Sequence, residues 1–371
     1  MMKRREFGQK LVGGTIGASV AGASAITHAP AQGSRTPRKN SLMHVGGDYH
    51  SVAGQRITSR ANLEYNLRYG VKHLTVQAKN RLEGGGWDLD ALKRMKDDCD
   101  QYGVQLEAIR MEPTYITLPK GLERDRELDN ILGNIQKASV VGVKIITYHW
   151  TVIPIRRNRE TPGRGKVTYS GFKLEENWKD LPVGKSGNVD SEEYWDRIGN
   201  FLMKAIPAAK EHNVRLACHP YDPPGLPHGY QGTDNWDSPS IFDSIKRYAS
   251  IVDSPYNGFQ LCLGTTAEGL KHPNTEVLPI VQYLGERGKI YQIHMRNIRG
   301  GLHNFEEVYP DEGEMDFFQI MRILRDVQFA GSVCPDHMPH HAEDPGSLQS
   351  FAFGYGYIKA LIQAVNSEVG S

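Results

Sequence analysis

From residue 42 onward, short apolar runs alternate with longer stretches in which apolar residues recur every three or four positions. The short runs are nearly continuous in apolar and β-branched residues, which is typical of strands buried on both faces of a parallel sheet. We therefore predict eight strands, at 42–47, 71–77, 104–110, 143–149, 214–219, 258–263, 289–294 and 331–335.

The longer stretches predict helices. In 123–140, for example, Leu128, Ile131 and Ile135 share one helical face. Gly103 follows 88–102 in the position of a helix-ending glycine, and Pro207 is expected to kink the helix that contains it. The predicted helices are 57–69, 88–102, 123–140, 191–212, 238–251, 274–287, 314–327 and 347–366.

Eight strands, each followed by a helix, predict a single (β/α)8 barrel, the TIM-barrel architecture, over residues 42–371. The alternative is an open doubly wound sheet. No Gly-x-Gly-x-x-Gly follows the first predicted strand, which disfavours a dinucleotide-binding version of that sheet. The helix-free stretch 150–190 follows the fourth strand, so we expect a functional loop, such as a lid, over the C-terminal mouth of the barrel, or else a disordered segment.

The first thirty-one residues read as an export signal. Arg4-Arg5 precedes Phe7, a run of small residues follows, and Ala29-Pro30-Ala31 is a candidate cleavage site. We predict a twin-arginine signal peptide at 1–31, a polar linker at 32–41, and a periplasmic or secreted protein. The alternative is a basic N-terminus that is amphipathic or disordered.

Composition narrows the class of partner. With 44 Lys+Arg and 43 Asp+Glu, the formal charge is +1, so no charge excess points to nucleic acid or to a membrane surface beyond the signal segment. Four cysteines in 371 residues make no disulfide framework. We expect a small-molecule ligand, and a homo-oligomer is compatible with the sequence.

Residues of types that bind metals lie at the ends of four consecutive predicted strands. His219, Cys262 and His294 close the fifth, sixth and seventh strands, and Asp336 follows the eighth. The carboxyl ends of barrel strands meet at one rim, so these side chains are expected to lie together. Two imidazoles, a thiolate and a carboxylate suit Mn²⁺, Fe²⁺, Co²⁺ or Zn²⁺ and are too soft for a dedicated Mg²⁺ or Ca²⁺ site.

Each of these residues also has an ordinary structural explanation. Cys262 alone would be a small buried hydrophobic residue, His219 could hold a loop, and Asp336 could cap a helix. The metal hypothesis depends on their joint occurrence at adjacent strand ends. Cys218 is out of phase with His219, so it should point elsewhere.

The same region resembles the mannonate dehydratase family, which belongs to the xylose-isomerase-like barrels. The resemblance spans nearly the whole chain after the linker and is strongest from about 215 to 337. The motifs that carry it are Cys-His-Pro-Tyr-Asp-Pro-Pro (218–224), Leu-Cys-Leu-Gly (261–264), His-Met-Arg-Asn-Ile-Arg (294–299), Asn304-Phe305-Glu306-Glu307, Glu314-Met315-Asp316 and Pro-Asp-His (335–337).

This resemblance implies a carbon–oxygen lyase that removes water from a sugar acid to give a 2-keto-3-deoxy acid, with a metal, typically Mn²⁺, at the same four strand-end residues. His337 matches a family histidine proposed for proton transfer, and its alternative role is to orient Asp336.

Three further residues are candidate substrate contacts. Arg296 would suit the substrate carboxylate, or else forms a structural ion pair. Asn297 follows it, and His149 ends the fourth strand at the same rim.

The chain departs from the family at several positions. It has Tyr221 where the family usually has Asp, and Ser347 where the family has a tyrosine proposed as catalytic; Tyr355 or Tyr357 could substitute. These departures predict a shifted substrate. The alternatives are a sugar isomerase or epimerase, a β-eliminating lyase acting on an oxidised sugar, and a non-catalytic periplasmic sugar-binding protein.

Overall fold

The computed structural model describes residues 39–50, 57–78, 81–154, 156–234 and 240–369. The predicted signal peptide and most of the predicted linker lie outside these residues. At the end of the linker, the backbone N–H of Ser41 donates to Asn366 Oδ1 at 2.7 Å.

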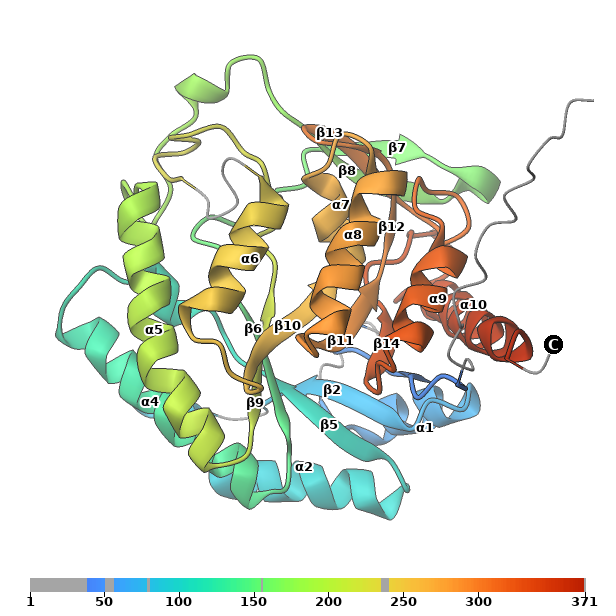
Figure 1. The fold of residues 1–371 in the computed structure, drawn as a ribbon, viewed down its shortest axis with the longest axis horizontal. Helices are drawn as coiled ribbons and strands as arrows, with labels where there is room; N and C mark the ends of the chain where they lie inside the picture. The colour runs from blue at the N-terminus through green and yellow to red at the C-terminus, as the bar shows by residue number, and fades with distance from the viewer. Residues whose placement is uncertain (1–38, 51–56, 79–80, 155, 235–239, 370–371) are drawn as a thin grey trace, which may run out of the picture. The chain divides into compact units, whose positions relative to one another are not determined.

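Eight parallel strands form the barrel, and every strand predicted from the sequence is confirmed (Figure 1). They follow one another around the sheet in chain order, and a bridge between Gly47 and Leu74 joins the first two. The strands are β1 (His44–Val45), β2 (His73–Gln77), β5 (Gln105–Arg110), β6 (Ile145–His149), β9 (Arg215–His219), β10 (Asn257–Cys262), β11 (Ile290–Met295) and β14 (Ser332–Pro335).

The predicted helices also form, each within a few residues of the expected bounds. Side-chain caps fix several N-termini: Asp88 accepts from the backbone N–H of Asp90 and Ala91, for example. The helices are α1 (Arg60–Arg68), α2 (Leu89–Gln101), α4 (Leu122–Val140), α5 (Ser191–Glu211), α6 (Ile241–Ile251), α8 (Pro273–Glu286), α9 (Phe317–Asp326) and α10 (Leu348–Ser367), with short α3 (Thr114–Thr117) and α7 (Leu263–Glu268).

The stretch 150–190 is not the irregular loop that we expected. It contains β7 (Arg159–Pro162), β8 (Thr168–Lys173) and two 3₁₀ turns, η1 (Arg164–Lys166) and η2 (Trp178–Asp180). These strands join β12 (Asn297–Gly301) and β13 (Asn304–Val308) in a four-stranded antiparallel sheet. The sheet lies beside the C-terminal ends of the barrel strands, since β12 begins two residues after β11 ends (Figure 1). A separate hairpin pairs β3 (Arg81–Leu82) with β4 (Gly85–Trp87).

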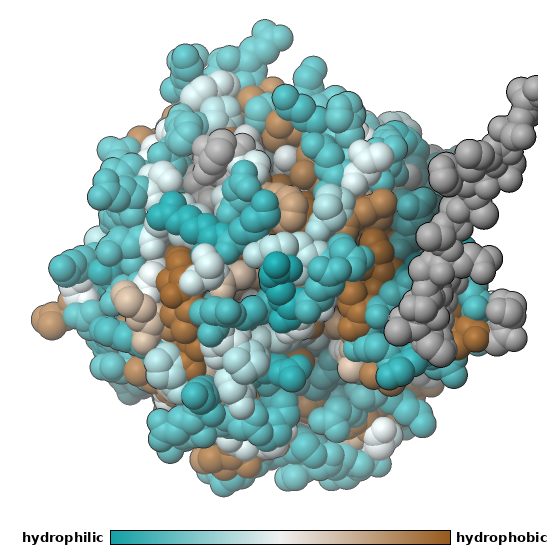
Figure 2. Space-filling view, in the orientation of Figure 1, coloured by the Kyte–Doolittle hydropathy of each residue, from teal (hydrophilic) through white to brown (hydrophobic). Residues whose placement is uncertain are grey.

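Outward-facing strand residues pack with the helices in one large hydrophobic cluster. Inside the barrel, a small cluster that includes Ala108 and Tyr291 lies near a polar layer. In that layer, Gln260 donates to Gln292, which donates across the barrel to Thr75. On the face shown in Figure 2, hydrophobic residues occur in separate patches among hydrophilic ones. None of the described helices is long and apolar enough to span a bilayer.

Candidate active site

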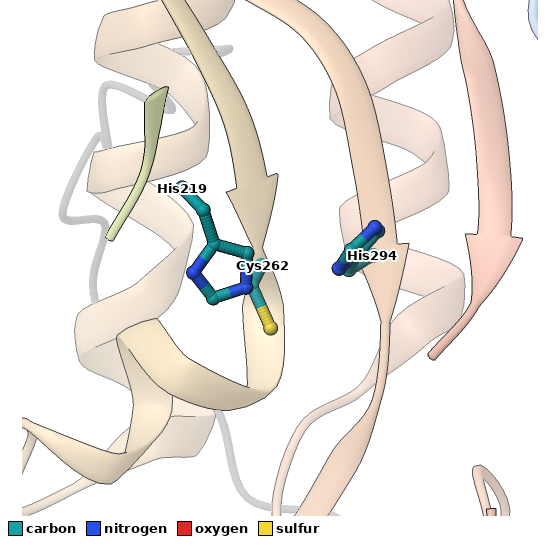
Figure 3. A group of neighbouring side chains, drawn as sticks. All are labelled: His219, Cys262 and His294. Carbon is teal, nitrogen blue, oxygen red and sulfur yellow. The ribbon is translucent and has the colours of Figure 1, made fainter. Parts of the chain in front are cut away.

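The four predicted metal ligands come together at the C-terminal rim of the barrel. Ligand atoms of His219, Cys262 and His294 lie within 4.8 Å of one another (Figure 3). Asp336 adjoins them: its Oδ2 lies 3.5 Å from Cys262 Sγ, and its Oδ1 lies 3.4 Å from His294 Nδ1. All four side chains are buried, so an ion among them would be largely shielded from water.

Each histidine in this cluster is oriented through its other ring nitrogen. Nδ1 of His219 lies 2.7 Å from the carbonyl oxygen of Pro220, which can only accept, so Nδ1 carries the proton. Nε2 of His294 donates to Asp48 Oδ2 at 3.1 Å. These bonds leave Nε2 of His219 and Nδ1 of His294 as the nitrogens that face the cluster, and this is how partners orient metal-binding histidines.

The thiol of Cys262 lies in a positive local field. Burial would raise the pKa of this thiol, but the guanidinium of Arg296 and the imidazole of His219 lower it well below its ordinary value. Arg296 Nη2 lies 3.5 Å from the sulfur, and the backbone N–H of Thr265 donates to it at 3.3 Å. These contacts favour the thiolate form of Cys262, which is the form that binds metals.

These residues fit a borderline divalent cation. Nδ1 of His294 is buried and makes no hydrogen bond to a described residue. Burial would lower the pKa of His294, but Asp336 and Asp48 raise it well above its ordinary value. The negative charge that favours a proton on His294 would equally favour a cation, which competes with that proton. The mixed nitrogen, sulfur and oxygen donors match Mn²⁺, Fe²⁺, Co²⁺ or Zn²⁺.

A cavity of about 280 Å³ opens above this cluster, and its wall includes His50 and His337. His337 Nδ1 lies 2.8 Å from Glu307 Oε1, and His50 Nδ1 lies 2.9 Å from Asp48 Oδ1. Their rings are 5.2 Å apart and nearly perpendicular. Burial would lower the pKa of His337, but Asp336 and Glu307 raise it. The site therefore contains a pair of imidazoles, each next to a carboxylate.

Another part of the cavity wall carries Arg110 and His149, at the ends of β5 and β6. The Arg110 guanidinium lies 4.6 Å from the centre of the Tyr49 ring, and its Nη1 is buried without a hydrogen bond to a described residue. Burial, Arg110 and His219 lower the pKa of His149, which is thus neutral. A half-buried guanidinium whose Nη1 lacks a described partner, beside a neutral imidazole, can bind an anionic group of a ligand.

The structure pairs Arg296 and Asn297, two of the predicted substrate contacts, with other groups of the protein. Neither is among the described residues that line the cavity. Arg296 is 1% exposed, and its guanidinium contacts Glu268 at 2.6 Å and Asp336 at 3.1 Å. Asn297 donates to the carbonyl oxygens of Pro310 and Met315. The polar groups of both residues therefore already have protein partners, and these contacts connect the chain segments beneath the cavity.

The departures from the family pattern also have positions in the structure. Ser347 is buried and hydrogen-bonded to His340 Nδ1 at 2.9 Å. Tyr355 donates to Asn66 Oδ1, away from the cavity, so it does not replace a catalytic tyrosine there. The tyrosine that lines the cavity is Tyr49, in the loop after β1.

Sequence reasoning missed Asp48, His50 and Arg110. Arg110 could have been found, since it ends a predicted strand by the same argument that found His219. Asp48 and His50 lie three to five residues beyond the short strand β1, and only the tertiary contacts of that loop reveal them.

Comparison with known proteins gives consistent matches. The model of the D-mannonate dehydratase (UxuA) family matches residues 173–369. A mannonate dehydratase from Thermotoga neapolitana is 27% identical over 327 residues, which cover 76% of this chain and 88% of that protein.

Solved structures show the same fold. The crystal structure of mannonate dehydratase from Streptococcus suis serotype 2 has a TM-score of 0.74 at 21% identity, covering 90% of this chain and 96% of that one. A 3-keto-D-glucoside 4-epimerase from E. coli has a TM-score of 0.57 at 15% identity, covering 86% and 99%.

Proposed function

This chain belongs to the D-mannonate dehydratase family, and we propose that it is a metal-dependent lyase that removes water from a sugar acid to give a 2-keto-3-deoxy acid. The observation that carries the proposal is the convergence of His219, Cys262, His294 and Asp336 beneath a cavity. The wall of that cavity contains an arginine whose Nη1 lacks a described partner and two histidines next to carboxylates.

The four convergent residues would hold the divalent cation, with Mn²⁺ the first to be tested. A bound cation supplies Lewis-acid stabilisation of the negative charge that develops on the carboxylate and α-hydroxyl oxygens when the α-proton leaves. Asp48 and Pro220 keep the two imidazoles in the tautomers that this role requires. Arg296 holds the Cys262 sulfur as a thiolate.

Arg110 would bind the carboxylate of the sugar acid. Its buried Nη1 lacks a hydrogen-bond partner among the described residues, and a carboxylate oxygen would supply one. Neutral His149, which also lines the cavity, would bond to a neighbouring hydroxyl group. Of the predicted substrate contacts, this proposal keeps His149 and assigns the carboxylate to Arg110 in place of Arg296.

His337 and His50 would carry the proton transfers. Dehydration breaks the C–H bond α to the carboxylate and the C–O bond at the β-carbon, and the two fragments leave as a proton and as water. One imidazole must accept the α-proton and the other must protonate the departing hydroxyl. Glu307 lies at the Nδ1 side of His337 and Asp48 at the Nδ1 side of His50, so Nε2 of each ring would make the exchange; Nε2 of His337 lies 3.8 Å from Asp336 Oδ1.

The test is an assay of the purified protein with Mn²⁺ and a panel of sugar acids that includes D-mannonate. We expect a 2-keto-3-deoxy product, detected by mass spectrometry as the loss of one water. Cys262→Ser should reduce the rate at least about 100-fold, since it removes a ligand of the cation. Cys99→Ser, in the buried face of α2, is the matched control and should retain activity.

Other outcomes would favour the alternatives. Incorporation of solvent deuterium into a sugar without loss of water would indicate an isomerase or epimerase. Cation-dependent binding of a sugar acid without turnover would indicate a binding protein, and either result would contradict the lyase proposal.

A further inference from the structure

A second group of metal-ligand side chains lies at the opposite end of the barrel, where the strands begin. His44 and His73 are the first residues of β1 and β2, and Glu107 lies near the start of β5. These three strands are neighbours: β2 pairs with β5, and β1 meets β2 through the Gly47–Leu74 bridge. The group is thus separated from the candidate active site by the barrel interior.

Both histidines point a nitrogen at the same carboxylate oxygen. His44 Nε2 lies 2.8 Å from Glu107 Oε2, and His73 Nδ1 lies 2.9 Å from that atom. The centroids of the two rings are 3.8 Å apart, and the ring planes are tilted by 36°. One ligand atom from each residue falls within 4.8 Å of the others. Ligand atoms around a tetrahedral zinc ion are about 3.3 Å apart, so small shifts would complete a site.

A shift of register between β2 and β5 orients the side chain of Glu107 toward the two histidines. In the β2–β5 ladder, Leu74 pairs with Leu106 and Thr75 pairs with Ala108, so Glu107 is the extra residue of a bulge. A bulge redirects the side chain that it carries. Burial would raise the pKa of Glu107, but hydrogen bonds from the two histidines lower it well below its ordinary value. The group therefore presents two nitrogens and an ionised carboxylate.

The three side chains line an open cavity of about 390 Å³. The exposed fractions of His44 and His73 are 29% and 36%, and that of Glu107 is 12%, so an ion can reach all three. Lys144 and Arg215 also line this cavity, and the Arg215 guanidinium lies 5.1 Å from the centre of the Tyr291 ring. Those two cations would favour water or an anion as the fourth ligand.

We propose that His44, His73 and Glu107 bind a zinc ion at the N-terminal end of the barrel. Two histidines and a glutamate with an open fourth position form an established zinc ligand set. The ion would join β1 to β2 and β5 at the seam where the barrel closes. That seam is short, since β1 spans two residues and the described bonds across it are Gly47 N–H to His73 O and Thr75 N–H to Gly47 O. This site is independent of the function proposed above.

The test is the zinc content of chelator-stripped protein after equilibrium dialysis against micromolar Zn²⁺. We expect His73→Ala to bind one equivalent of zinc less per chain than the wild type. Zinc bound at the active-site cluster contributes equally to both proteins and does not affect this difference. His272→Ala, which removes an exposed histidine at the start of α8, is the matched control and should bind as much as the wild type. Zinc should also raise the melting temperature of the wild type more than that of His73→Ala.

A second variant covers the case in which His73→Ala does not fold. Glu107→Gln keeps a hydrogen-bond acceptor for the histidines but removes the anionic ligand, so it too should lose one equivalent. Cobalt titration separates the two sites, because only the Cys262 site gives a thiolate-to-cobalt charge-transfer band. Equal zinc content in the wild type and in both folded variants would overturn this proposal and leave the lyase proposal untouched.

Discussion

Oδ2 of Asp48 lies 3.1 Å from Nε2 of His294, and this contact fixes which nitrogen of the buried imidazole faces the ligand cluster. Asp48 belongs to the loop after β1, whereas His294 is in β11. The loop that follows the first barrel strand therefore orients a residue of the seventh. The contact makes Asp48 part of the proposed cation site although it is not one of its four ligands.

We predict that Asp48→Asn lowers the affinity for Mn²⁺ by about 10- to 100-fold, because an amide holds the histidine less firmly than a carboxylate does. Competition with a chelator measures the effect. Asp253→Asn, whose side chain is exposed and paired with Lys289, is the control and should bind Mn²⁺ as the wild type does. Unchanged affinity in Asp48→Asn would refute the orienting role.

Arg110→Met should raise KM for the sugar acid by about 10- to 100-fold, since a charge-assisted hydrogen bond to the substrate is lost. The number of Mn²⁺ ions bound should not change, because Arg110 is not among the ligands. Arg94→Met, on the exposed face of α2, is the matched substitution and should leave KM unaltered. Steady-state kinetics decide the matter, and an unaltered KM in Arg110→Met would place the carboxylate elsewhere.

Neighbouring arginines in the segment after β6 should differ greatly in their contribution to stability. Arg157 is 13% exposed and pairs with buried Asp222 and Glu307, whereas Arg156 pairs with Glu175 near the surface. Arg157→Ala removes a positive charge that balances these buried carboxylates, and it should lower the free energy of unfolding by about 3–5 kcal/mol.

Arg156→Ala should cost about 0–1 kcal/mol. Urea denaturation of the two variants gives the comparison. Similar losses in both would show that the charge cluster at Glu307 does not depend on Arg157.

Glu368 should contribute to stability in a pH-dependent way. Hydrogen bonds from Arg322 and Arg325 lower the pKa of this carboxyl from 4.5 to about 2. Its contribution is therefore complete above pH 4.5 and is lost as the pH falls through about 2. Glu368→Gln should lower the melting temperature at pH 7, and the difference from the wild type should shrink below pH 4.5.

Thermal unfolding at several pH values tests this expectation, with exposed Glu211→Gln as the control. A difference between Glu368→Gln and the wild type that is independent of pH would mean that packing of the C-terminus of α10, rather than charge, is responsible.

The sequence by itself determined the barrel and the proposed ligands. Strands buried on both faces leave continuous apolar runs, so all eight could be located without knowing what they pair with. Because parallel barrel strands end at one rim, a strand-end position suffices to bring His219, Cys262, His294 and Asp336 together. The local pattern and the chain order contain this information.

Only the tertiary structure decided the surroundings of those ligands. The antiparallel sheet pairs β8 with β13, more than one hundred residues apart, and no local pattern records that pairing. Arg296 is buried and pairs with Glu268 and Glu307 from separate segments, which is the structural ion pair that the sequence left open as an alternative. The bulge that aims Glu107 at His44 and His73 depends on strand register. Burial and charge pairing are set by long-range contacts, so they lie beyond what a linear pattern can specify.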